Sequence, residues 1–140
     1  MGTKETKWSG ARNALVVTEV GPDVLLCKLS GFHDDASIVA QFATWFDART
    51  SSGRRIHMFW DTEETTGYKT HCREALQHWQ KSAAPRIATS TVLVRSKLME
   101  MALSITNLIM GSLHKATNDR RKFEILMAQA VRDAVGPRRA

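Results

Sequence analysis

The hydrophobic positions along the chain follow two different periods, which separate the expected strands from the expected helices. Short apolar runs rich in β-branched residues predict strands, whereas apolar residues spaced three and four apart predict amphipathic helices. On this basis, strands are expected at 14–20, 24–29, 56–60 and 86–94, with a short edge strand at 114–118. Helices are expected over 34–50, 68–83, 97–110 and 121–135.

Local signals support the ends of these elements. Residues 21–23 read Gly-Pro-Asp, which is turn chemistry between the first two strands. Asp34 or Asp35 provides an N-cap for the first helix, and Ser96 one for the third. Pro85 prevents the second helix from continuing. The elements therefore have defined boundaries.

The resulting order is β-β-α-β-α-β-α-(β)-α, an alternation that implies parallel strands joined by right-handed crossovers. With 140 residues and 43% hydrophobic composition, the chain is long enough for one core. We therefore expect a single α/β domain over 14–135, with a mixed sheet of four to five strands and about four packed helices. A mostly disordered lead is expected at 1–13 and a basic tail at 136–140.

The charge, cysteine and hydropathy patterns limit the cellular compartment and the classes of partner that we expect. The net charge is +6, but seven Lys or Arg against three Asp or Glu lie from His114 onward, so +4 belongs to the last 27 residues. This distribution favours a solvated basic end over a specific nucleic-acid site. Cys27 and Cys72 lie in apolar patterns, and no segment matches a signal peptide or a membrane span. We expect a cytoplasmic protein without cofactors.

The segment that follows the strand at 56–60 is the strongest candidate site, because open α/β sheets bind ligands at the carboxyl ends of their strands. We expect it to be a loop that leads into a helix. Phosphate would be favoured near the amides of that helix, and the alternative is that Thr65 or Thr66 only caps the helix. The residues of this candidate site are Asp61, Thr62, Glu63, Glu64, Thr65, Thr66 and Gly67.

A strand ending in Asp61, followed by Thr66-Gly67 before a helix, resembles the STAS domain of anti-sigma factor antagonists, in particular its SpoIIAA-like branch. The resemblance covers residues 14–135. It implies a regulatory protein-binding module in which a partner kinase phosphorylates the residue before the glycine. By position the acceptor is Thr66, with Thr65 as second choice. Glu63 and Glu64 would repel such a phosphate unless a nearby cation compensates.

An enzyme is a less favoured hypothesis. Asp61, Glu63 or Glu64 would have to converge with His57 or His71 for acid–base chemistry, and neither HExxH, CxxC nor GxSxG occurs in the sequence. Cys72 lies on an apolar stripe and is expected in the core. We therefore predict a non-enzymatic protein, with no metal site.

The helix at 97–110 is apolar on more than one side, because Met99, Leu103 and Met110 widen its hydrophobic face. Exposed, these residues would form a surface for a partner protein or for a second copy; covered by the C-terminal helix, they would be core. The same excess supports an alternative function, a helix-lined apolar pocket for a lipid or small molecule. A cavity of several hundred Å³ would favour this alternative.

Overall fold

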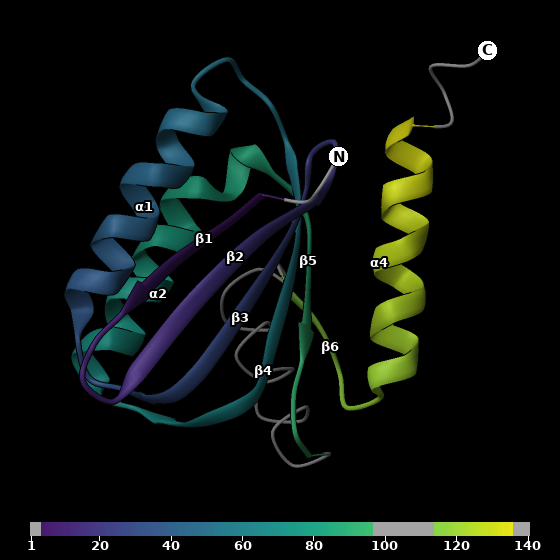
Figure 1. Ribbon diagram of the computed structural model, residues 1–140. Coiled ribbons are helices and arrows are strands. Elements are labelled where there is room, and N and C mark those ends of the chain that lie inside the picture. Colours follow the sequence, from purple (N-terminus) through teal and green to yellow (C-terminus); the bar gives the residue numbers. More distant parts are fainter. Residues whose placement is uncertain (1–3, 97–113, 136–140) are drawn as a thin grey trace.

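In a computed structural model, which describes residues 4–96 and 114–135, helices pack on both faces of one sheet (Figure 1). The strands are β1 (Lys4–Ser9), β2 (Asn13–Gly21), β3 (Val24–His33), β4 (Ile56–Tyr68), β5 (Ile87–Leu93) and β6 (His114–Thr117). The helices are α1 (Ala36–Thr50), α2 (Thr70–Ala83) and α4 (Arg120–Val135), with a 3-10 turn at Ala84–Arg86. The expected α/β class is confirmed, and the sheet has one strand more than the upper expected number.

The six strands lie side by side in their order along the chain. The first three pair antiparallel, and β3 to β6 pair parallel. Helices α1 and α2 cover one face, and α4 covers the other (Figure 1). The sheet is therefore mixed, and each parallel crossover between β3 and β5 places its helix on the same face.

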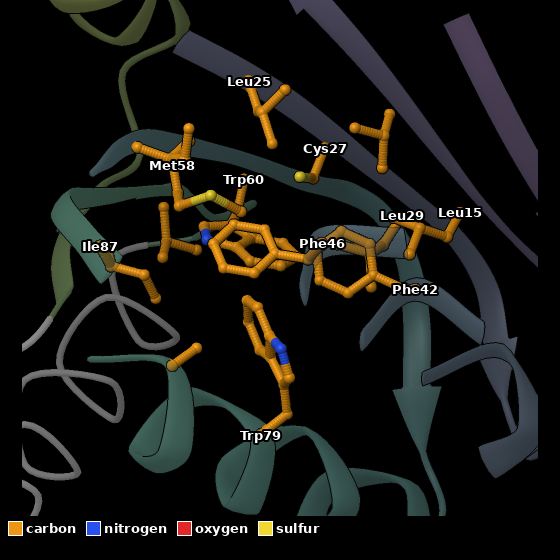
Figure 2. Packing of buried hydrophobic residues seen from close by; sticks show 14 of the residues in the cluster. Leu15, Leu25, Cys27, Leu29, Phe42, Phe46, Met58, Trp60, Trp79 and Ile87 are labelled. Carbon is orange, nitrogen blue, oxygen red and sulfur yellow. The ribbon is translucent and has the colours of Figure 1, made fainter. Parts of the chain in front are cut away.

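The larger core lies between the sheet and the pair α1 and α2. Aromatic rings fill its centre. The ring centroid of Trp79 in α2 lies 4.9 Å from that of Phe42 and 5.1 Å from that of Phe46, and both contacts are edge-to-face. Trp60 of β4 packs on this group from the side of the sheet, with its ring centroid 6.0 Å from that of Trp79 (Figure 2). Edge-to-face geometry is the favoured arrangement for packed rings. Trp60 and Trp79 are 3% and 6% exposed and anchor this core.

A smaller core lies beneath α4. Phe123 is 1% exposed and contacts Phe59 of β4 edge-to-face, with centroids 5.7 Å apart. Val24 and Leu93 complete the buried group. Because α4 supplies only one fully buried side chain, its attachment to the sheet depends in part on polar contacts described below.

The beginning of the chain departs from the sequence-based expectation. Residues 4–9, expected within a disordered lead, form β1 and pair with β2 from Lys4↔Glu19 to Ser9↔Ala14. Trp8 gives this strand its anchor, because its ring packs edge-to-face on Phe42 and Trp45 of α1. The prediction of disorder is therefore wrong for this segment.

Most of the other described elements follow the predicted pattern, although β3 and β4 continue beyond their expected ends at residues 29 and 60. Asp35 is the N-cap of α1 and accepts a hydrogen bond from the amide of Ser37 at 3.0 Å. Cys27 and Cys72 are both free and buried, as expected. The helix expected at 97–110, with Met99, Leu103 and Met110, lies outside the described residues. Within the described part of the chain, no helix has the length and apolar character needed to cross a membrane.

Candidate functional site

The candidate segment 61–67 is part of a strand, not the loop expected from the sequence. Strand β4 continues to Tyr68 because β3 also continues, pairing Ser30 with Glu64 and Gly31 with Thr65 across two register shifts. Strand β5 pairs with β4 only as far as Asp61. The rest of β4 thus projects beyond β5 as a ribbon with β3.

Neither threonine caps the following helix. Helix α2 begins at Thr70, and its N-cap residue is Lys69, whose side chain makes no capping hydrogen bond. The sequence-based interpretation of Thr65 or Thr66 as the cap is therefore wrong. For the same reason, the two threonines do not lie among the first amides of α2, and the helix dipole does not account for a phosphate there.

The two threonines differ sharply in exposure. Thr65 is 2% exposed, and its hydroxyl donates a hydrogen bond to the carbonyl oxygen of Leu29 at 3.2 Å. Its own carbonyl oxygen accepts a hydrogen bond from Arg95 Nη2 at 3.1 Å. Thr66, the next residue, is exposed. Of the two hydroxyls, only that of Thr66 is open to an incoming enzyme.

Gly67 lies against an aromatic ring. A Cβ atom at this position would approach the Phe32 ring to 3.2 Å, so a side chain there would require the ring to move. Arg12 stacks on the same ring, with its guanidinium carbon 4.9 Å from the centroid. The residue after Thr66 is therefore packed against β3.

Two acidic residues of the segment are held by one arginine of α4. Asp61 is 5% exposed, and its Oδ2 atom accepts a hydrogen bond from Arg120 Nη2 at 2.8 Å. Arg120 Nε also donates to Oε1 of Glu63 at 2.9 Å. These hydrogen bonds raise the pKa of Arg120, whose guanidinium is in any case charged at every ordinary pH. Through its contacts with Asp61 and Glu63, Arg120 links the first turn of α4 to β4.

The third acidic residue is paired across the sheet. Glu64 Oε2 lies 2.8 Å from Nζ of Lys28 on β3, and this hydrogen bond raises the pKa of the lysine. Thr62 donates its hydroxyl to the carbonyl oxygen of Leu93 at 2.7 Å. Every carboxylate of the segment thus has a cationic partner, and most of its polar side chains have structural contacts.

The residues required by the enzyme hypothesis are not brought together. His57 lies four residues before Asp61 on the same strand, roughly 13 Å away at the usual rise per residue, and contacts Thr89 through Nδ1 at 2.8 Å. His71 lies on α2, across the sheet from the Asp61–Arg120 pair. Burial raises the pKa of the Cys72 thiol, which weakens it as a nucleophile. Among the described residues, no cluster of His, Cys, Asp or Glu suited to a metal is found.

A buried polar group that the sequence reasoning missed lies on the opposite face, where α1 and α2 meet the sheet. His33 is 6% exposed, its ring stacks on Tyr68 at 5.2 Å, and Nδ1 lies 3.2 Å from Nδ2 of Asn13. Because an amide nitrogen only donates, Nδ1 is the acceptor and the neutral ring carries its proton on Nε2. Burial lowers the pKa of His33.

His33, Asp35, Tyr68 and Trp60 line a cavity of about 20 Å³ together with apolar side chains. This volume holds about one water molecule, and Nε2 of His33 has no hydrogen-bond partner among the described residues. Histidine at the end of an apolar strand gives no signal for such a site, because the same pattern occurs at exposed strand ends.

No family model and no curated protein matches the sequence. A solved structure similar to the chain is an uncharacterized protein of the DUF3478 family with a SpoIIAA-like fold from Shewanella loihica PV-4. It is 15% identical, covers 86% of this chain and 98% of its own, and has a TM-score of 0.67. The chain therefore has a SpoIIAA-like fold, as the resemblance in its sequence predicted.

Proposed function

We propose that the protein is a non-enzymatic regulatory module of the cytoplasm, which binds a protein partner through residues 61–67 of β4 and is switched by phosphorylation of Thr66. The SpoIIAA-like fold supports the general class. The observation that carries the choice of site is the contrast between the buried Thr65 hydroxyl and the exposed Thr66. This contrast favours Thr66 over Thr65 as the acceptor.

The local charges are compatible with a phosphate at Thr66. From the sequence alone, Glu63 and Glu64 would repel a group carrying nearly two negative charges. In the structure Arg120 pairs with Glu63 and Lys28 with Glu64, which reduces the repulsion. The exposed side chain of Lys69 follows three residues later. The added charge would change the surface that a partner contacts.

The strand geometry also favours a binding surface here. Beyond Asp61, β4 has β3 on one side and no paired strand on the other among the described residues. Backbone order in this ribbon is kept by side-chain hydrogen bonds from Thr62 and Thr65. A ribbon held by these hydrogen bonds loses little conformational entropy when a partner binds at the exposed Thr66.

The proposal is tested by placing a photo-crosslinking amino acid at position 66 in the source cell. Thr44, an exposed threonine on α1, is the matched control position. We expect one discrete protein adduct from position 66 and none from position 44, and we expect Thr66→Glu to change partner capture. The absence of an adduct at 66, or the same adduct from both positions, would contradict the proposed surface.

The alternative of an apolar ligand pocket has less support in the described residues. The cavity beside His33 has a volume of about 20 Å³, far below the several hundred Å³ of ligand sites. The helix on which this alternative depended, at 97–110, lies outside the described residues. Mass spectrometry of the natively purified protein distinguishes the two, because a copurified lipid or metabolite would favour the pocket.

A further inference from the structure

We propose that a second copy of the chain adds to the sheet through β1, pairing antiparallel about Thr6, and that this forms a symmetric dimer. Strand β1 is at one end of the six-stranded order and is hydrogen-bonded only to β2 among the described residues. Lys4, Glu5 and Lys7 are exposed on it. This surface lies three strands from β4, so the inference does not depend on the proposed function.

The backbone groups available at this edge follow from the pairing with β2. The amide of Gly10 donates to the carbonyl oxygen of Asn13 at 2.8 Å, which makes these two residues a hydrogen-bonded pair. Antiparallel ladders alternate such pairs, so Lys4, Thr6 and Trp8 bond to β2. The N–H and C=O groups of Glu5, Lys7 and Ser9 therefore point away from the sheet.

These outward groups fit a copy of the same strand in one particular register. With Thr6 opposite Thr6, Glu5 of one copy faces Lys7 of the other, and both residues have outward backbone groups. Two such pairs arise by symmetry, each with two backbone hydrogen bonds and one opposite-charge contact. Opposite charges directly across a sheet stabilise pairing, and like charges weaken it. The sequence Lys4-Glu5-Thr6-Lys7-Trp8 is thus complementary to itself.

The other face of the strand supports the same register. Lys4 lies opposite Trp8 of the second copy, where its ammonium group can contact the ring face. The Trp8 ring is already held in place by Phe42 and Trp45, with centroids 6.0 and 5.9 Å away. Neither Glu5 nor Lys7 forms an ion pair with another described residue. Their charges are therefore available to a second copy.

Charged residues at a sheet edge can also prevent pairing with another chain. Charge reversal distinguishes this protective role from the proposed role in dimerisation. In Glu5→Lys, two lysines oppose each other in each pair, and in Lys7→Glu two glutamates do. Combining both substitutions restores opposite charges with their positions exchanged. A dimer built as proposed is weakened by each single change and recovered by the double change.

The measurement is analytical ultracentrifugation of the full chain from about 10 µM to about 1 mM, a range that covers weak association. The wild-type protein is expected to dimerise, with a dissociation constant raised about tenfold or more in each single variant and returned toward wild type in the double variant. Circular dichroism and intrinsic tryptophan fluorescence verify that each variant is folded. A monomeric wild-type protein throughout this range, or association unchanged by either single reversal, would overturn the proposal.

Lys7→Pro provides a second test that acts on the backbone. The Lys7 amide points outward, so proline at this position removes an intermolecular donor without removing a bond to β2. Loss of the dimer with unchanged thermal unfolding supports pairing through this edge. A dimer as strong as that of the wild type would contradict it.

Discussion

Arg120, the first residue of α4, donates a hydrogen bond from Nη2 to Oδ2 of Asp61 on β4, with 2.8 Å between the two atoms. The carboxylate is buried, whereas the arginine side chain is 46% exposed. A helix near the end of the chain is thereby fixed to the strand that carries the proposed site. Phe123 is the only fully buried residue of α4, and Met127 and Val131 pack against the same core, so the ion pair adds a polar contact to an apolar attachment.

Replacing Arg120 by Ala should destabilise the protein by about 1–2 kcal/mol, because the buried Asp61 carboxylate loses its charged partner. Arg121→Ala is the control, since Arg121 is exposed and its neighbouring position gives similar helix propensity. Its effect should stay within about 0.5 kcal/mol. Urea unfolding measures both, and equal effects would mean that the ion pair does not attach α4.

A negative charge should destabilise the protein strongly at Thr65 and hardly at all at Thr66. Thr65→Glu places a carboxylate in a site that is 2% exposed and lies against the Leu29 carbonyl oxygen, which should cost more than about 3 kcal/mol or prevent folding. Thr66→Glu should change stability by less than about 0.5 kcal/mol. Thermal unfolding of both variants checks this, and a well-folded Thr65→Glu protein would show that the assigned orientation is wrong.

His33 should make stability fall as the pH decreases. Burial lowers its pKa in the folded state, so the unfolded chain binds a proton first, near its ordinary value of about 6.5. The free energy of unfolding therefore declines below that pH until the lower folded pKa is reached, by at most about 1.4 kcal/mol per pH unit.

His33→Gln should flatten this dependence between about pH 7.5 and pH 5.5, because it removes the titrating ring. Urea unfolding at a series of pH values compares the two slopes. Identical slopes in the variant and the wild type would place the responsible group elsewhere.

Gly31 should tolerate a side chain poorly. Its φ angle is +81°, and a Cβ atom there would overlap the carbonyl oxygen of Arg12. Gly53 has a φ of +86° but no atom within 4 Å of the corresponding position. Gly53→Ala should thus cost about 1–2 kcal/mol from backbone strain alone, and Gly31→Ala clearly more. Unfolding free energies that are equal for the two variants would exclude the overlap as a cause.

The fold was largely predictable from the sequence because its apolar patterns are local. The turn at residues 21–23 and the stop at Pro85 mark real element ends, and the cap at Asp35 is observed. Strand β1 was missed because four of its six residues are exposed and its polar sequence has no buried face of its own. It forms because β2 offers an edge and Trp8 packs on α1, which are both long-range effects.

The candidate segment was expected to be a loop, whereas the structure places it in strand β4. Residues Asp61 to Gly67 look like a loop because they are acidic and hydroxylated, yet Ser30 and Gly31 of β3 extend the pairing. The decisive partner, Arg120, lies 59 residues from Asp61. Neither the buried state of Thr65 nor this ion pair has a signal within the segment itself.

Phosphopeptide mapping of the protein purified from its source cell tests the central claim most directly. We expect phosphate on Thr66 and none on Thr65, because Thr66 is exposed and Thr65 is buried. Thr66→Ala should then abolish the modification. Phosphate on Thr65, or Thr66 unmodified under conditions in which the partner complex dissociates, would contradict the claim that Thr66 is the switch.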